Sequence, residues 1–243
     1  METEIEERVK NYWTRRSHDF GAVRKNELAN AMGTRWLEEL QQHLPQGKPL
    51  EILDVGTGTG FFAILLGHLG HHVVGIDLTP AMLEEAKSQA RALGVTAEFL
   101  QMDAQALDFG DGRFDVVLSR NLTWTLPDPQ KAYAEWLRVL KPGGILLNYD
   151  ADYAANVRSE STQNRSVAPD SPYGHVGMTQ EMQRENDAIT LALDLGKARP
   201  AWDAVTLANL GAQCCRTDLT VGKRVLGPSD LEHAPMFGVF AIK

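Results

Sequence analysis

The segment EILDVGTGTG, from Glu51 to Gly60, constrains the fold of this chain more than any other. Residues 51–55 have the apolar character of a buried strand, and three glycines follow before an apolar helical pattern begins. Glycine adopts backbone angles that other residues avoid, and it lets a ligand approach the main chain closely. The segment therefore predicts a strand–loop–helix unit able to hold a nucleotide-type cofactor.

Apolar runs of the same kind recur along the middle of the chain, with helical patterns between them. Thr79 and Pro80 are expected to start one helix and Gly94 to end it, and Asp128-Pro129 is expected to start another. Apolar strands separated by helices are typical of a mostly parallel sheet covered on both faces. The sequence thus predicts an α/β, doubly wound domain with strands at 51–55, 72–77, 98–102, 114–118 and 144–149.

The two ends of the chain differ from this alternating middle. Residues 1–44 read as two helices, which we expect to form an N-terminal helical cap on a main domain of residues 45–243. Two further strands are expected near 216–221 and 237–242. Their connection of about 15 residues is short for a covered crossover, so an antiparallel pair is predicted.

An insert of about 151–200 is expected to follow the fifth strand. Its first part, 151–176, is polar and carries two prolines and several serines, so it is predicted as a loop. Helices are expected at about 179–196 and 200–210.

The composition of the chain argues against several classes of protein. There are 24 basic and 32 acidic residues, a formal net charge of −8, which disfavours a nucleic-acid binder. No apolar run approaches the roughly 18 residues of a membrane span, and the acidic start METEIEERVK is unlike a signal peptide. The adjacent Cys214 and Cys215 have no zinc-site spacing. We expect a cytoplasmic protein with a small-molecule substrate and no nucleic-acid, membrane or metal partner.

The residues around the glycine loop discriminate between cofactors. A dinucleotide site needs G-x-G-x-x-G, but this chain has G-x-G-x-G, with Phe61 where the last glycine would fall. Asp54 precedes the loop, where a carboxylate would favour an ammonium group rather than a pyrophosphate. Asp77 ends the next strand and could accept the two hydroxyls of a ribose, and Asp103 follows the third strand.

With these motifs, the chain resembles the class I S-adenosylmethionine-dependent methyltransferases over about residues 45–150. The resemblance rests on LDVGTGTG at 53–60, VGIDLTPAM at 74–82, QMDA at 101–104, FDVV at 114–117 and LKPGG at 140–144. It implies a Rossmann-like seven-stranded sheet whose last strand runs antiparallel. It also implies S-adenosyl-L-methionine as the cofactor.

The resemblance further implies positions for the parts of the cofactor. The glycine loop would pass under the methionine part, Asp77 would bind the ribose, and Arg120 and Asn121 would lie near the transferred methyl. The full set of implied cofactor residues in the domain is Asp54, Gly56, Thr57, Gly58, Gly60, Asp77, Leu78, Met82, Asp103, Ala104, Arg120 and Asn121.

Aromatic and basic residues alternate in YWTRRSHDF, residues 12–20. Similar segments in related methyltransferases fold over the cofactor, so we expect a lid. In that lid Tyr12 or Phe20 would shield the sulfonium, and Arg16 would lie near a carboxylate. The alternative is a capping helix whose aromatic side chains belong to the core.

The sequence gives fewer indications of which residues contact the methyl acceptor. Trp124, after the fourth strand, could line an acceptor pocket or belong to the core. The Asn/Asp-Pro-Pro-aromatic motif of many amino-group methyltransferases is absent from this position, which argues against methylation of nucleic-acid bases. Asp150, Tyr173 and His175 are weak candidates for a catalytic base, and a solvated loop histidine is the commoner role of His175. No full set of metal ligands can be assembled from the sequence.

Three functions stay open at this point. The first is methyl transfer to a small molecule by direct in-line displacement. The others are an NAD(P)-dependent oxidoreductase on a similar sheet and a non-catalytic protein that binds S-adenosylmethionine or S-adenosylhomocysteine. Within residues 11–26, Arg15, Arg16, Arg24 and Lys25 outnumber the single acid Asp19, which leaves room for an anionic acceptor.

Overall fold

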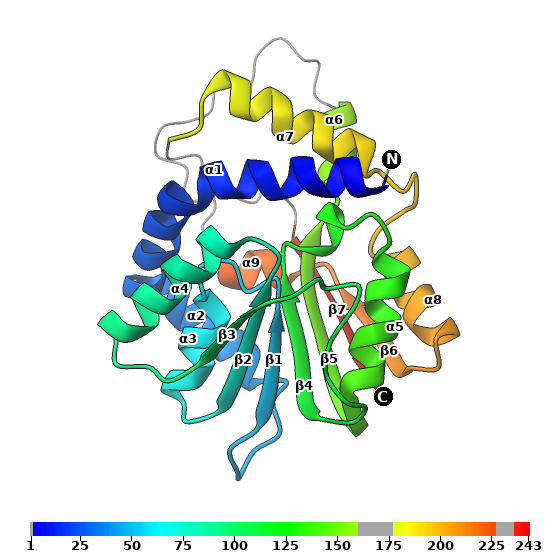
Figure 1. Cartoon of the computed structure of the whole chain (residues 1–243). Helices are drawn as coiled ribbons and strands as arrows, with labels where there is room; N and C mark the ends of the chain where they lie inside the picture. The colour runs from blue at the N-terminus through cyan, green and yellow to red at the C-terminus, as the bar shows by residue number, and fades with distance from the viewer. Residues whose placement is uncertain (1, 160–176, 227–235) are drawn as a thin grey trace.

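A computed structural model describes residues 2–159, 177–226 and 236–243, and it contains a seven-stranded sheet in the order β3-β2-β1-β4-β5-β7-β6 (Figure 1). Strands β1 to β5 pair in parallel, whereas β7 pairs antiparallel with both β5 and β6. The predicted doubly wound sheet and its antiparallel last strand are confirmed. The strands are β1 (Glu51–Val55), β2 (His72–Asp77), β3 (Glu98–Gln101), β4 (Phe114–Arg120), β5 (Leu140–Ala151), β6 (Gln213–Asp218) and β7 (Met236–Ile242).

Helices cover both faces of this sheet. One face packs on α2 (Ala31–Gln41), α3 (Phe61–His68), α4 (Pro80–Ala92) and α9 (Val221–Val225). The other face packs on α5 (Pro129–Val139) and α8 (Ala201–Asn209). The two faces alternate along β4, where Val116 and Leu118 point to the first core and Val117 to the second, as period-two geometry requires.

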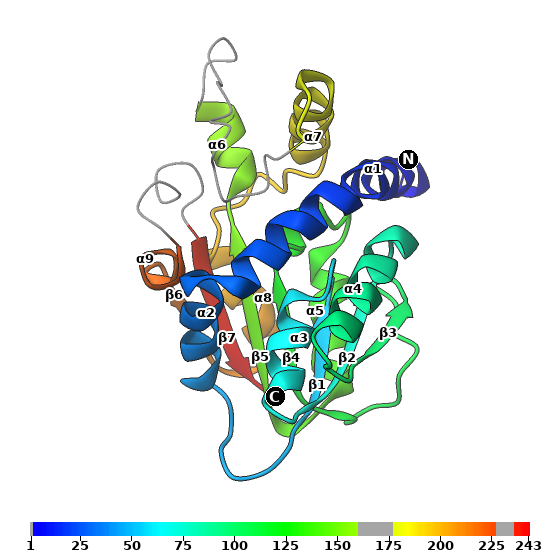
Figure 2. The same ribbon diagram turned by 90° about the vertical axis from the view of Figure 1, so that its left-hand side faces the viewer.

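Above the sheet lie three helices and a 3-10 turn. The long α1 (Glu2–Ala29) crosses the end of the sheet at which β1 leads into the glycine loop, and α7 (Gln180–Ala192) lies above it (Figures 1 and 2). The short α6 (Tyr153–Ser159) follows β5, and η1 (Thr123–Thr125) follows β4. In parallel α/β sheets, ligands bind at this carboxyl edge.

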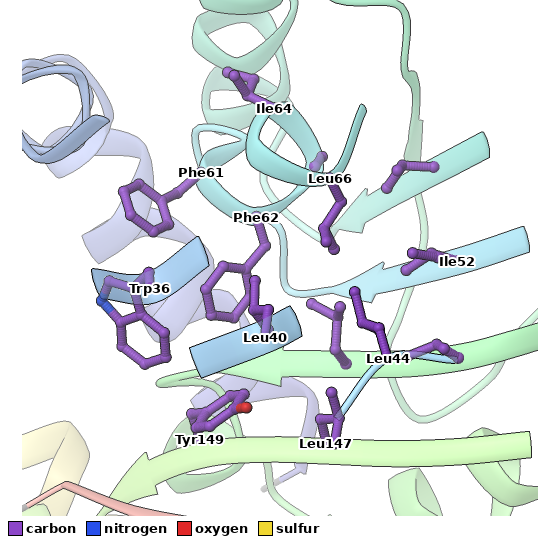
Figure 3. Close-up of a cluster of buried hydrophobic side chains, with 14 of the residues drawn as sticks. Trp36, Leu40, Leu44, Ile52, Phe61, Phe62, Ile64, Leu66, Leu147 and Tyr149 are labelled. Carbon is purple, nitrogen blue, oxygen red and sulfur yellow. The ribbon is translucent and has the colours of Figure 1, made fainter. Parts of the chain in front are cut away.

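One core is organised around an aromatic group on α2, α3 and β5 (Figure 3). Trp36 is fully buried, and its ring lies edge-on at 5.1 Å from both Phe62 and Tyr149. Leu40 and Leu44 follow Trp36 at intervals of four residues, and all three side chains belong to one apolar stripe in this core. The apolar stripe therefore holds α2 against the sheet and fixes the end of α1 that precedes it.

Several element boundaries differ from those predicted. Residues 153–159 form α6 where a loop was predicted, because Asp152 Oδ1 accepts a hydrogen bond from the Ala155 amide at 3.0 Å and Tyr153 packs on Trp124. β6 begins three residues earlier than predicted. Thr79 stands at the N-cap of α4 without a side-chain capping bond; its own amide donates to Asp77 Oδ1 instead. The remainder of the predicted loop, 160–176, lies outside the described residues.

No helix in the described ranges is both long enough and apolar enough to cross a membrane.

The aromatic group around Trp36 predicts a large stability effect. Trp36→Ala removes a fully buried indole and should lower the free energy of unfolding by about 3–5 kcal/mol. Leu93→Ala, at a side chain with 53% exposure, should change it by less than about 0.5 kcal/mol. Urea unfolding with a constant m-value measures both. Equal effects of the two substitutions would contradict this account of the core.

Candidate functional site

The glycine loop adopts a backbone that requires glycine. Gly56, Gly58 and Gly60 have φ values of 66°, 54° and 86°. A Cβ on Gly56 would lie 2.7 Å from the Leu122 side chain, and one on Gly60 would lie 3.1 Å from Ala86. The loop thus combines left-handed backbone with close packing, and it presents main chain rather than side chains at the carboxyl edge of β1.

Asp77 ties this loop to the end of β2. Its Oδ2 accepts a hydrogen bond from the Gly58 amide at 3.0 Å, and its Oδ1 accepts one from the Thr79 amide at 2.8 Å. Burial raises the pKa of this carboxyl, and the backbone hydrogen bonds oppose the increase. Each carboxylate oxygen has more than one lone-pair direction, so each can accept a further hydrogen bond, for instance from a ligand hydroxyl.

Asp54 holds the loop in place by hydrogen bonds. It is only 2% exposed, and its Oδ2 accepts hydrogen bonds from Thr57 Oγ1 at 2.6 Å and from the Ala63 amide at 3.1 Å. Burial raises the pKa of this carboxyl to about 7, although its hydrogen bonds with Thr57 and Ala63 act in the opposite direction. Asp54 thus joins the glycine loop to the first turn of α3, a role that the charge argument from sequence did not include.

The expected adenine-side residues lie at the ends of β2 and β3. Met82 is buried in α4, and Leu78 is partly exposed in the turn before it. Asp103 Oδ1 accepts a hydrogen bond from the Gln105 amide at 2.8 Å, and the Ala104 carbonyl accepts one from Trp136 Nε1 at 3.0 Å. The loop after β3 is therefore fixed to α5.

A group of buried charges lies between the end of β4 and α1. Arg120 Nη1 donates to Glu27 Oε2 at 3.0 Å, and Arg24 Nη1 donates to Glu27 Oε1 at 2.6 Å. Burial alone would raise the pKa of Glu27, but the two guanidinium groups outweigh it and lower this pKa below its ordinary value. Asn121 follows with a φ of 56°, and its amide donates to the Tyr149 carbonyl at 2.8 Å.

Helix α1 carries the residues expected in a lid. Tyr12 and Arg16 are 5% and 1% exposed, and a Cβ on Gly58 would lie 3.8 Å from the Phe20 ring. The Tyr12 hydroxyl contacts Met178 Sδ at 3.7 Å. Burial raises the pKa of Tyr12 to about 12, against the lowering effect of Arg16. At neutral pH Tyr12 therefore carries a hydroxyl rather than a phenolate.

Asp150 lies in a closed polar network. It is fully buried, and it accepts hydrogen bonds from the Thr123 hydroxyl, from the Trp124 amide at 3.2 Å and from the Ala151 amide at 2.8 Å. Arg199 Nη1 lies 3.5 Å from its Oδ2. The carboxylate has no open side towards a substrate. Tyr173 and His175 lie outside the described residues.

Trp124 lies at the edge of this network. Its ring lies 4.9 Å from that of Tyr153, which brings η1 and α6 together above the end of β4.

In the described part of the chain, no three His, Cys, Asp or Glu side chains are arranged to hold a metal ion.

Comparisons with known proteins agree on one family. Residues 53–148 match the model of a methyltransferase domain. The demethylmenaquinone methyltransferase of Thermus thermophilus is 41% identical over 115 residues, which are 46% of this chain and 52% of that protein. A ubiquinone biosynthesis O-methyltransferase of Cereibacter sphaeroides is 29% identical over 130 residues, 54% of this chain and 52% of that protein. Residues 53–148 of this chain are thus similar to a methyltransferase domain.

A solved structure extends the likeness in fold to most of the chain. The S-adenosylmethionine-dependent methyltransferase from Aquifex aeolicus superposes with a TM-score of 0.58 and 20% identity, covering 90% of this chain and 96% of that one. By sequence, the chain spans about half the length of the curated relatives it matches. The match to a methyltransferase domain favours the methyltransferase prediction over the oxidoreductase alternative.

Sequence reasoning missed an ion-pair group that joins α1 to the carboxyl edge of the sheet. Glu27 and Arg24 join α1 to β4, yet in the sequence they are two charges on a mostly polar helix. Their spacing of three residues was the available signal, because it predicts a local ion pair. The third member, Arg120, lies 93 residues away from Glu27 and could be connected to them only through the fold.

The raised pKa of Asp54 predicts a pH dependence of stability. The folded-state pKa of about 7 exceeds the unfolded value of about 3.9, so folding favours the protonated carboxyl. The free energy of unfolding should therefore fall as the pH rises from about 4 to 7. A pKa difference of this size corresponds to about 4 kcal/mol.

The Asp54→Asn variant lacks this titration, so its stability should change less than that of the wild type between pH 5 and pH 8. Urea unfolding at several pH values measures the difference. Parallel pH profiles of the two proteins would show that Asp54 does not titrate as described.

Proposed function

We propose that this chain transfers the methyl group of S-adenosylmethionine to a small-molecule acceptor by direct in-line displacement. The observation that carries the proposal is the hydrogen bond from the Gly58 amide to Asp77, which holds a glycine-rich loop beside a carboxylate. The methyltransferase relatives support it, since the two described above are named for menaquinone and ubiquinone chemistry.

The residues at the carboxyl edge fit such a cofactor. Gly58 leaves room for the methionine part against the main chain, because it carries no Cβ, whereas the space beside Gly56 is filled by the Leu122 side chain. The two oxygens of Asp77 suit the two hydroxyls of a ribose. Arg120 ends β4 and Asn121 follows it, and both are proposed to lie at the methionine end. Leu78, Met82, Asp103 and Ala104 complete the proposed site on the adenine side.

The bound cofactor would supply a methyl group already activated by a sulfonium. The chain's tasks are then to align the acceptor, exclude water and accept a proton where the acceptor carries one. Tyr12, Arg16 and Phe20 on α1 are proposed to close over the loop. Tyr12 would act there as a hydrogen-bond donor, because its raised pKa keeps the hydroxyl protonated.

We do not assign a catalytic base. Asp150 is closed off by Thr123, Trp124 and Arg199, which supports a role in holding η1 rather than in proton transfer. Tyr173 and His175 stay candidates from the sequence. The location in the cytoplasm likewise stays a prediction from composition.

An anionic acceptor group is part of the proposal, and it would lie near Arg16. Three arginines of the N-terminal segment pair with acids in the chain: Arg15 with Glu181, Arg16 with Asp19 and Arg24 with Glu27. Arg16 is almost fully buried, and buried charges are screened much less than exposed ones, so an anion beside Arg16 would be attracted more strongly than one beside the exposed Arg15.

Asp77 gives the sharpest test of cofactor binding. Asp77→Asn keeps the shape of the side chain but removes its charge and one acceptor, so the affinity for S-adenosylhomocysteine should fall about 10- to 100-fold. Titration calorimetry measures this affinity. Asp108→Asn, at an exposed residue outside the proposed site, is the matched control and should bind as the wild type does. Equal affinities of the two variants, or tighter binding of NAD than of S-adenosylhomocysteine by the wild type, would contradict the assignment.

Transfer itself is tested with methyl-labelled S-adenosylmethionine and a metabolite extract. Label should enter small molecules that are retained on an anion exchanger. Label found only in neutral products would rule out the anionic group while leaving methyl transfer intact. Binding of S-adenosylhomocysteine with no transfer to any fraction would instead identify a non-catalytic binding protein.

A further inference from the structure

Helix α7 lies antiparallel on top of α1 (Figures 1 and 2). Glu181 pairs with Arg15 and Glu185 pairs with Arg8, so residue numbers rise along one helix as they fall along the other. At the start of α7 a Cβ on Gly177 would overlap the Asp19 carboxylate, which shows how closely the two segments approach.

Helix α7 buries few of its side chains. Its fully buried residues are Ile189 and Thr190, and in the described part of the chain it packs mainly on α1, α6 and η1. The sheet contributes little to its packing. A segment with so few buried apolar contacts belongs to the least stable part of a structure and opens more readily than the core.

The two ion pairs are therefore a large part of what holds α7 to α1. Arg8 makes a two-pronged contact with Glu185, from Nε at 3.0 Å and from Nη2 at 3.1 Å, and these side chains are 40% and 34% exposed. Arg15 and Glu181 approach to 3.3 Å and are 50% and 78% exposed. Pairs exposed to this degree are weak and are screened by salt.

We propose that α7 is a lid latched onto α1 by the Arg8–Glu185 and Arg15–Glu181 ion pairs, and that breaking them opens a route to the site under α1. Tyr12 on α1 contacts Met178, which lies immediately before α7. Opening of α7 would therefore reach the proposed site at Tyr12. The statement about the route rests on the proposed function. The latch itself does not.

The latch makes a prediction about hydrogen exchange. When α7 leaves α1, a helix of 13 residues with little packing is marginal in water, so its backbone amides exchange in the open state. Hydrogen-exchange mass spectrometry of the full chain at low salt therefore reports the opening. Glu185→Arg should speed exchange of residues 180–192 by about threefold to tenfold, because it replaces an attraction by a repulsion.

The charge swap supplies the decisive comparison. Arg8→Glu alone should accelerate exchange in α7 as Glu185→Arg does, whereas the double variant Arg8→Glu/Glu185→Arg should return it to within about twofold of the wild type. Raising the salt to 1 M, where the Debye length is about 3 Å, should move the wild type towards the single variants.

Lys87→Glu is the matched control, because it disrupts a pair with Glu84 on α4 that has a similar N–O distance of 3.0 Å and a lysine 39% exposed. It should leave exchange in α7 unchanged. Failure of the double variant to restore slow exchange, or an equal effect of Lys87→Glu, would overturn the latch.

Stopped-flow binding of S-adenosylhomocysteine then tests the route. Glu185→Arg should raise both the association and the dissociation rate by similar factors, with the equilibrium affinity nearly unchanged. Faster exchange in α7 without faster binding would retain the latch and reject the route. Absence of binding to the wild type would reject the proposed function, while the exchange result would still decide the latch.

Discussion

The carboxylates of Asp54 and Asp77 hold the glycine loop, and the site depends on them. Asp54 joins the loop to α3 through Thr57 and Ala63, and Asp77 joins it to the end of β2 through Gly58. Glycine alone would make this loop adaptable, whereas hydrogen bonds from two neighbouring strands fix it. Burial raises the pKa of both carboxyls, so the protonation of the groups that hold the loop depends on pH.

The sequence was sufficient to predict the central fold, because the five parallel strands are mainly apolar runs. The antiparallel β7 followed from the shortness of its connection. The helix α6 was missed because its stability comes from Asp152 and from packing on Trp124, neither of which produces an apolar period. α9 was missed for a similar reason: it is only five residues long, too short for periodicity to reveal.

The candidate site likewise contains residues that the sequence could predict and residues that it could not. Residues at the end of a strand, such as Asp77, could be predicted because strand order fixes their neighbours. Charges that meet across the fold could not: Glu27 meets Arg120, and Arg199 meets Asp150, only after α1 and the insert have packed. The excess of basic residues in 11–26 also could not be interpreted from the sequence alone, because Glu181, which pairs with Arg15, lies on α7. The cofactor side is thus encoded locally, and the acceptor side depends on tertiary structure.

The central claim is that the glycine loop and Asp77 hold the methionine and ribose parts of S-adenosylmethionine. A crystal structure of the full chain with S-adenosylhomocysteine tests it most directly. The account predicts ribose hydroxyls within hydrogen-bond distance of both Asp77 oxygens and the amino-acid part over Gly56 and Gly58. A ligand bound elsewhere on the molecule, or bound at this edge without contact to Asp77, would contradict it.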